Sequence, residues 1–273
     1  MLKPLKLAVI AIPIFAAVHS EARTVVSKVT GRPVAYANVG VINRNIGTVT
    51  DTLGNFHLEV PEIRPDDSLR ISSIGYESIT FALSDAALIP DTIRLAEKAI
   101  QLGEIEVKPE RIRQRTAGRE KAGGFIYLNV EGYKAAGQGL ATPLKVKSRA
   151  WLKELGFTIL DNASTLSGMH FRINVYRKED GKYIKENIEP QYFTYSRNEL
   201  QNGKFSYVFP TEIMLEKGDY YIELEFLENF QNEYFIMTSR PLTGKTRYRY
   251  ASESDWETLP FGAPIYVVYD TVE

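Results

Sequence analysis

Residues able to do chemistry are few in this 273-residue sequence. It contains no cysteine and only three histidines, His19, His57 and His170. None lies in an HExxH pattern, and a zinc site needs at least three protein ligands. Gly-x-Ser-x-Gly and glycine-rich phosphate-binding patterns are also missing. We therefore predict no catalytic residue, no metal site and no cofactor, and we interpret His57 and His170 as histidines on strand surfaces.

The numerous carboxylates leave one route to catalysis, an acidic pair at the separation that glycosidases use. The sequence identifies no such pair, so a glycoside hydrolase-like enzyme remains only a second alternative. Asp51 with Asn55, and Asp66-Asp67, could be calcium ligands. They lack the tight alternation of a calcium loop, and we interpret them as turn residues.

Aromatic residues near predicted turns of the second half could stack on sugar rings. The candidates for ligand stacking are Trp151, Tyr248 and Trp256. The alternative, which we favour, is that these rings fill a tyrosine-rich core with their polar atoms satisfied. Burial of Tyr248 and Trp256 would argue strongly against glycan binding.

The first 22 residues have the layout of a secretory signal peptide. Lys3 and Lys6 precede an apolar run from Leu7 to Val18, and a small-x-small cleavage site follows at residues 20–22. Because the run is shorter than the ~20 residues of a membrane span, we expect cleavage near Arg23 and no transmembrane segment in the mature chain. An uncleaved N-terminal anchor is the alternative. Removing Lys3, Lys6 and Glu21 leaves 31 basic and 33 acidic residues, a balance that gives no general attraction to nucleic acid.

Short alternating segments bounded by turn residues predict strands in two regions, 23–107 and 125–273. In the second region, residues 169–176 place Phe171, Ile173 and Val175 on one face, with the intervening side chains opposite. In the strand at 220–227, Glu223 and Glu225 are expected to face water. Residues 108–124 carry six basic and two acidic residues and end in Gly-Gly, which predicts a basic linker. The linker could contact lipid phosphates or an acidic partner, although we favour a solvated segment.

Several turn and strand motifs follow one another in residues 31–107. They are Gly31-Arg32-Pro33-Val34, Ala37-Asn38-Val39, Gly47-Thr48-Val49-Thr50-Asp51, Gly54-Asn55-Phe56, Ser72-Ser73-Ile74-Gly75-Tyr76-Glu77 and Leu102-Gly103-Glu104-Ile105-Glu106-Val107. Asp51 can bond to its own turn backbone, and Gly54 can supply a positive φ. Phe56 is expected to anchor the returning strand, and Gly75 to let the chain turn while Tyr76 packs back.

In their order and spacing these motifs resemble the carboxypeptidase-regulatory-like (transthyretin-like) domain, which is abundant in envelope proteins of the Bacteroidetes. In relatives this domain often precedes TonB-dependent receptors, but no plug or barrel follows here, so the resemblance does not imply a receptor. It implies a seven-stranded sandwich. The predicted fold class is therefore all-β, with this sandwich followed by a second, jelly-roll-like β-sandwich.

We predict a non-catalytic exported envelope protein, in the periplasm or at the outer membrane or cell surface, that acts as an interaction or scaffold module. Two rigid sandwiches can present loops or a strand edge to an envelope protein partner. The first alternative is a glycan-binding accessory protein of an outer-membrane uptake system.

Overall fold

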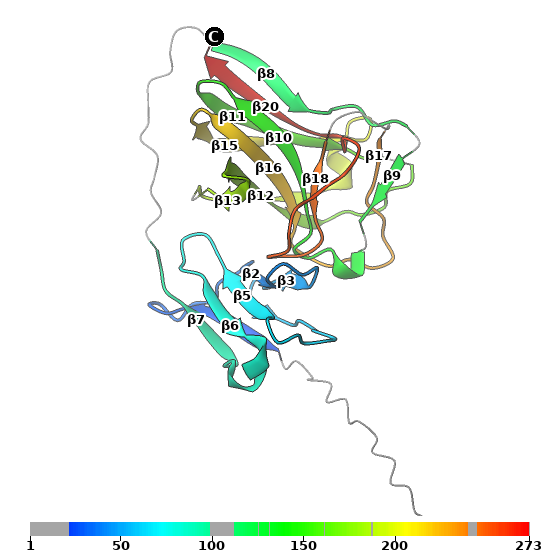
Figure 1. Ribbon diagram of the computed structural model, residues 1–273. Helices are drawn as coiled ribbons and strands as arrows, with labels where there is room; N and C mark the ends of the chain where they lie inside the picture. The colour runs from blue at the N-terminus through cyan, green and yellow to red at the C-terminus, as the bar shows by residue number, and fades with distance from the viewer. Residues whose placement is uncertain are drawn as a thin grey trace, which may run out of the picture.

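The computed structural model describes residues 22–98, 112–124, 126–130, 132–160, 162–186, 188–239 and 245–272. Residues 1–21 of the predicted signal peptide and residues 108–111 of the predicted linker lie outside this part of the chain. Two β-sandwiches follow one another along the sequence, and Figure 1 shows the first below the second. The predicted all-β class is confirmed, including seven strands in the first sandwich. No helix of the described residues is long and apolar enough to cross a membrane.

The first sandwich packs a three-stranded sheet, in the order β4-β1-β7, against a four-stranded sheet, in the order β3-β2-β5-β6. Its elements are β1 (Arg23–Ser27), β2 (Asn38–Val41), β3 (Gly47–Val49), β4 (Asn55–Phe56), β5 (Ser68–Ser72), β6 (Ile79–Ala82), η1 (Leu83–Leu88) and β7 (Thr92–Leu95). Strand β1 runs parallel to β7 and antiparallel to β4. Apolar residues from both sheets, including Val25, Val39, Ile71 and Ile93, form its core.

The second sandwich is larger. Its elements are β8 (Ile112–Gly118), β9 (Ile126–Asn129), η2 (Gly132–Lys134), β10 (Gly139–Val146), β11 (Ala150–Thr158), β12 (Met169–Glu179), β13 (Lys182–Lys185), β14 (Gln191–Tyr195), η3 (Arg197–Glu199), β15 (Lys204–Leu215), β16 (Gly218–Phe226), β17 (Ile236–Ser239), β18 (Arg247–Arg249), β19 (Glu257–Thr258) and β20 (Ile265–Val272). A seven-stranded sheet in the order β13-β12-β16-β10-β18-β19, with β14 also paired to β12, packs on a four-stranded sheet in the order β15-β11-β20-β8. Strands β17 and β9 form a separate pair.

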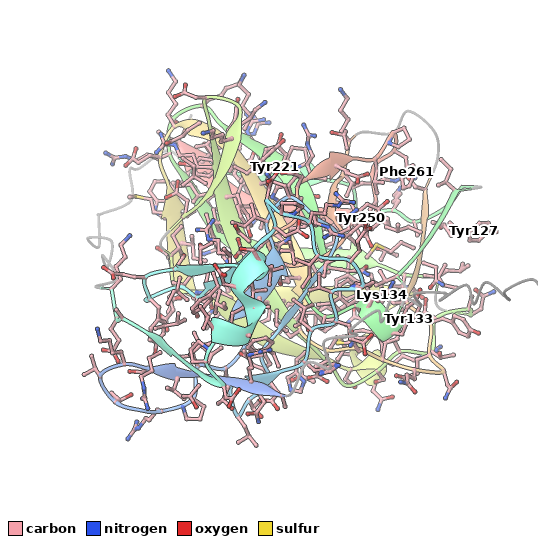
Figure 2. The ribbon with its side chains drawn as sticks, turned by 60° about the horizontal axis from the view of Figure 1, so that its bottom comes forward. Tyr127, Tyr133, Lys134, Tyr221, Tyr250 and Phe261 are labelled. Atoms are coloured by element: carbon pink, nitrogen blue, oxygen red, sulfur yellow. The ribbon has the colours of Figure 1, made fainter. Side chains whose placement is uncertain are left out.

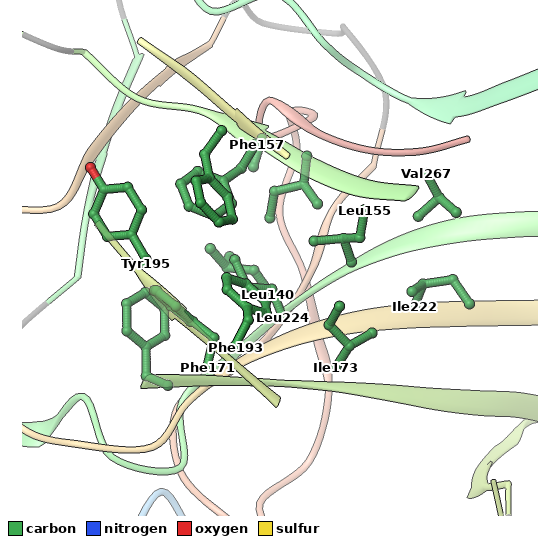
Figure 3. Packing of buried hydrophobic residues seen from close by; sticks show 14 of the residues in the cluster. Leu140, Leu155, Phe157, Phe171, Ile173, Phe193, Tyr195, Ile222, Leu224 and Val267 are labelled. Atoms are coloured by element: carbon green, nitrogen blue, oxygen red, sulfur yellow. The ribbon is translucent and has the colours of Figure 1, made fainter. Parts of the chain in front are cut away.

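Alternation along β12 and β16 fills the core between these sheets. Phe171 and Ile173 point inward from β12, and Ile222 and Leu224 point inward from β16, as the sequence predicted (Figure 3). Aromatic rings dominate one end of this core. Phe157 lies at its centre, with ring centroids 5.1 to 6.0 Å from those of four neighbouring aromatic residues, Phe171, Tyr195, Phe205 and Phe235. This packing leaves the opposite face of the large sheet free to carry polar side chains.

The predicted basic linker is wrong over residues 112–118. This segment forms β8 and pairs antiparallel with β20 at the edge of the four-stranded sheet, from Ile112 opposite Val272 to Gly118 opposite Tyr266. Most of its side chains are exposed. A strand at a sheet edge can carry polar residues on nearly every position, so its composition resembles that of a linker.

Candidate functional site

The outer face of the seven-stranded sheet carries a row of charged residues set side by side by strand register. Arg172 of β12 lies opposite Glu225 of β16, and Asn174 lies opposite Glu223. On the other side of β16, the residue opposite Glu225 is Gly139 of β10, which also pairs with Arg249 of β18. A Cβ atom on residue 139 would overlap the Glu223 carboxylate. Glycine at this position therefore leaves room for the Glu223 carboxylate, which Arg249 of β18 contacts.

These five residues, which we call the buried ion network, are Arg172, Asn174, Glu223, Glu225 and Arg249. Arg172 Nε donates to Glu225 Oε2 at 2.8 Å, and Asn174 Nδ2 donates to the same carboxylate at 2.6 Å and to Glu223 at 2.7 Å. Arg249 Nη2 lies 2.8 Å from Glu223 Oε1 and 3.0 Å from Glu225 Oε1. Both glutamates are 0% exposed, so the prediction that they face water is wrong. Buried charges persist because each has opposite charges and hydrogen bonds around it.

The protonation of the network follows from its geometry. Burial alone raises the pKa of Glu225, but the guanidinium groups of Arg172 and Arg249 outweigh that effect and lower this pKa to about 2. Burial raises the pKa of Glu223 against the opposing attraction of Arg249, and the nearby Glu225 carboxylate raises it further. The neighbouring carboxylates also raise the pKa of both arginines, against the effect of their burial. At neutral pH, Glu225 is therefore an anion held between two cations.

The ion network also joins the two sandwiches. Arg172 Nη1 donates to the Tyr36 carbonyl at 2.5 Å, and its Nη2 donates to the Asn38 side chain, both in the first sandwich. A second joint is formed where the Ser72 hydroxyl donates to the Glu253 carboxylate. The buried Arg172 side chain thus belongs to both domains, and their relative position depends on it.

Close backbone contact reinforces these joints. Gly40 of β2 and Gly47 of β3 lie against the Ser252 carbonyl of the second sandwich, and a Cβ atom at either position would overlap it. Two residues of the carboxypeptidase-regulatory-like motif, Asn38 and Gly47, are therefore interface residues here. Their motif positions predicted local strand and turn roles only.

A cleft of about 1010 Å³ opens beside this interface and is lined by both sandwiches. Three residues of one wall, Tyr176, Tyr183 and Trp256, pack together with Tyr221 in an aromatic cluster. The rings of Tyr176 and Trp256 lie 5.4 Å apart, and those of Tyr183 and Tyr221 lie 4.7 Å apart. The facing wall comes from the first sandwich and includes Arg70, Ser72, Tyr76 and Lys98. This volume is at the upper end of the range of small-molecule sites.

Cations lie over the rings of the aromatic cluster. The Arg249 guanidinium is 5.3 Å from the Trp256 ring centroid, and the Arg247 guanidinium is 5.6 Å from the centroid of Tyr183. Lys185 Nζ lies 5.9 Å from the Tyr176 centroid. Such contacts hold cation and ring in place together.

The three residues predicted to stack on a ligand have different environments. Trp151 and Tyr248 are buried, at 2% and 7% exposure, and the Tyr248 hydroxyl donates to Gln138, so neither can reach a ligand. Trp256 is half-buried and lines the cleft. The exposed tyrosines include Tyr127 and Tyr133, labelled toward one side of the molecule in Figure 2, which the sequence did not single out.

The turn chemistry predicted for the first sandwich is confirmed. Asp51 accepts hydrogen bonds from the backbone of Leu53 at 2.9 Å and of Asn55 at 2.7 Å. Gly54 has φ +77° and Gly75 has φ +81°. The remaining motif residues have positions within the fold. Thr48 of β3 pairs with Val39 of β2, Phe56 is buried in the core, and Tyr76 lines the cleft.

The histidines and aspartates considered as metal ligands lie apart. His57 is 3.5 Å from Glu59 and exposed, whereas His170 pairs with Glu228 in the other sandwich. Asp67 forms an ion pair with Arg44. Within the part of the chain that the structure describes, no three His, Asp or Glu side chains gather in a group able to hold a metal.

Comparisons with known proteins bear on the first sandwich. The family model of the CarboxypepD_reg-like domain matches residues 24–107. A search of curated proteins finds no match. Among solved structures, one of the Gt strain of infectious bursal disease virus has 13% sequence identity and a TM-score of 0.28. The match covers 92% of this chain and 55% of the viral chain. The Gx strain of the same virus gives 11% identity and TM-score 0.26, covering 92% and 56%. The chain thus spans just over half the length of these two solved chains.

The match at residues 24–107 begins within β1, extends past β7, and contains the Asp51 turn, Gly54, Phe56 and Gly75. The sequence motifs, the seven-stranded sandwich and the family model all identify the same segment as this domain. The protein therefore contains a carboxypeptidase-regulatory-like domain at residues 24–107, followed by a second β-sandwich.

Proposed function

We propose that this protein is a non-catalytic, exported cell-envelope interaction module whose binding site is the cleft between its two sandwiches. The observation that carries this proposal is the buried ion network, because Arg172 links the first sandwich to the sheet that forms one wall of the cleft. A cleft whose walls are fixed in this way is preorganised, so a ligand that bridges them loses little free energy to domain ordering.

The non-catalytic part of the proposal is supported by the state of the buried carboxylates. Glu223 and Glu225 are both hydrogen-bonded by Asn174 and paired with guanidinium groups. A general acid or base must exchange a proton with its substrate, and geometry comes before pKa in identifying one. These two glutamates are structural partners of Arg172 and Arg249, which makes them poor candidates for that role.

Export is supported by the layout of the N-terminus. Strand β1 begins at Arg23, so removal of residues 1–22 would leave every strand of the first sandwich intact. Expression of the full chain in a Gram-negative host, followed by fractionation and intact-mass measurement, should give an envelope fraction that lacks residues 1–22. An unprocessed chain in the cytoplasm would contradict this part of the proposal.

A glycan is the ligand class favoured by a specific observation, the position of Trp256 and Tyr183 on one wall of the cleft. Aromatic rings beside polar and charged groups can contact the apolar face of a sugar while its hydroxyls are hydrogen-bonded. The protein would then act as a glycan-binding accessory protein.

A glycan array tests this reading. The wild-type protein should bind a subset of glycans, and Trp256→Ala should lose that binding. Tyr234→Ala, which changes an exposed aromatic residue outside the cleft, is the matched control and should bind as the wild type does. Binding that survives in Trp256→Ala, or no binding by the wild type, would remove the glycan reading.

A further inference from the structure

Lys185 is a charged side chain of the cleft for which no ion pair is formed among the described residues. It is the last residue of β13, where Tyr183 and Lys185 are half-buried and the alternating residues Lys182 and Ile184 are exposed. Its ammonium lies over the Tyr176 ring. Within the described residues it forms no ion pair with a carboxylate, although it lines a cleft formed by both domains.

The buried ion network explains this lack of a partner. The charges of Arg172 and Arg249 repel the Lys185 ammonium and lower its pKa, whereas Glu225 and Glu223 raise it. Both glutamates form their ion pairs with those guanidinium groups and not with Lys185. Burial, and next the charge of Arg172, lower the pKa of Lys185 to about 7. The amine therefore carries only part of a positive charge at neutral pH, and no carboxylate of the described residues pairs with it.

No carboxylate on the described cleft walls forms an ion pair with Lys185. Tyr176 and Tyr183 are nearby titratable groups, and both have a raised pKa because of burial. The charged residues on the cleft walls, besides Lys185 and Arg249, are Arg70, Lys98, Lys182, Glu186, Glu253 and Asp255. Glu253 is engaged by Arg70, at 3.6 Å, and by Ser72. Lys98 and Lys182, one from each wall, also form no ion pair within the described residues.

We propose that the cleft recognises an acidic saccharide, whose carboxylate pairs with Lys185 while Trp256 and Tyr183 contact its ring. This inference rests on the proposed glycan-binding function and adds the ligand's charge to it. The carboxylates of the ion network pair with Arg172 and Arg249, so a ligand carboxylate would supply the counter-ion of Lys185. A charge-assisted hydrogen bond is also stronger than a neutral one. The adjacent aromatic cluster favours a ligand that also has an apolar ring face.

Binding should be linked to proton uptake. An anion beside Lys185 raises the pKa of its ammonium group in the complex, so the amine takes up a proton as the ligand binds. Affinity should be full below about pH 7, the pKa in the free protein, and should fall as pH rises toward the higher pKa of the complex. At pH 7 the uptake should approach about half a proton per ligand.

Isothermal titration calorimetry of the full chain tests the inference. The probes are oligogalacturonate, oligoalginate, oligohyaluronan and sialyllactose, each compared with its methyl ester. At least one acid should bind about 10- to 100-fold more tightly than its ester, the range expected for one charge-assisted hydrogen bond. Repeating the titration in two buffers with different ionisation enthalpies measures the proton uptake.

Variants of Lys185 separate its charge from its shape. Lys185→Met keeps an unbranched stem over Tyr176 and should lose the preference for the acid. Lys185→Arg, which stays charged at all relevant pH values, should keep the preference but bind without proton uptake between pH 6 and 9. Lys147→Gln removes an exposed lysine outside the cleft and should change neither property.

Each contrary result would refute a different claim. Esters that bind as tightly as acids, with binding lost in Trp256→Ala, would overturn the acidic specificity and leave the glycan-binding function intact. An acid preference that persists unchanged in Lys185→Met would overturn the role of Lys185. If no probe binds, the inference is wrong, and the array with Trp256→Ala decides the proposed function separately.

Discussion

Replacing Arg172 by methionine should destabilise the folded protein by about 3–5 kcal/mol at pH 7, because two buried carboxylates, Glu223 and Glu225, must then share the single guanidinium of Arg249. The side chain is 2% exposed, and its main partner, Glu225, is 0% exposed. The pKa of Glu225 points in the same direction, since the charge of Arg172, followed by that of Arg249, lowers it to about 2 against the opposing effect of burial.

The pH dependence gives this prediction a definite sign. The pKa of Glu225 is lower in the folded protein, so its stabilisation is present above the unfolded-state value of about 4.5 and is lost as pH falls toward 2. In Arg172→Met the folded-state pKa of Glu225 rises, and protonation then relieves the excess negative charge that Arg249 alone does not balance. The difference in stability between wild type and variant should therefore shrink by roughly half between pH 7 and pH 3.

Urea unfolding followed by far-ultraviolet circular dichroism measures both effects. Arg177→Met is the matched control on the same strand, because Arg177 pairs with Glu179 on the surface and should contribute less than about 1 kcal/mol. A double variant, Arg172→Met with Glu225→Gln, should recover part of the loss, since one buried carboxylate, Glu223, then pairs with one guanidinium, Arg249. A loss below about 1 kcal/mol in Arg172→Met, or one that does not vary with pH, would refute the account of the ion network.

Three further substitutions test the local geometry. Gly139→Ala places a methyl group against the Glu223 carboxylate and should cost about 1–3 kcal/mol in urea unfolding, whereas an unchanged midpoint would show that β10 can shift. Tyr248→Phe leaves the buried Gln138 oxygen without its donor and should lower stability by about 1–3 kcal/mol; a change below a few tenths would mean that another donor takes its place. Gly54→Ala forces a side chain into φ +77° and should lower the thermal midpoint measured by calorimetry, and an unchanged midpoint would contradict the turn assignment.

The sequence predicted on which side of a strand each residue lies, but it did not predict which side of the sheet another domain covers. Alternation along β12 and β16 correctly directed Phe171 and Leu224 into the core. The same alternation directed Glu223 and Glu225 to the other face, but it contains no information on whether another domain covers that face. Sequence reasoning therefore assigned these glutamates to water, although Arg172 and the first sandwich bury them.

The candidate site was hard to predict because its residues come from both domains and from distant strands. Trp256 was a candidate from its residue type, but so were Trp151 and Tyr248, which fill the interior. A ring near a turn can pack inward or outward, and only the tertiary structure decides. Lys185 gave no signal, because its position beside two buried arginines depends on strand pairing and on the docking of the first sandwich.

The pairing of β20 has a consequence for the order of folding. The first sandwich closes when β7 joins β1, using residues up to Leu95. In the second sandwich, β8 and the second edge of β11 pair with β20 (Ile265–Val272), at the far end of the sequence. A chain that leaves the ribosome N-terminus first can complete the first sandwich before the last strand of the second one has been synthesised. Stalled chains ending near residue 150 should already protect residues 23–95 from protease, and full digestion of that segment would disprove this vectorial order.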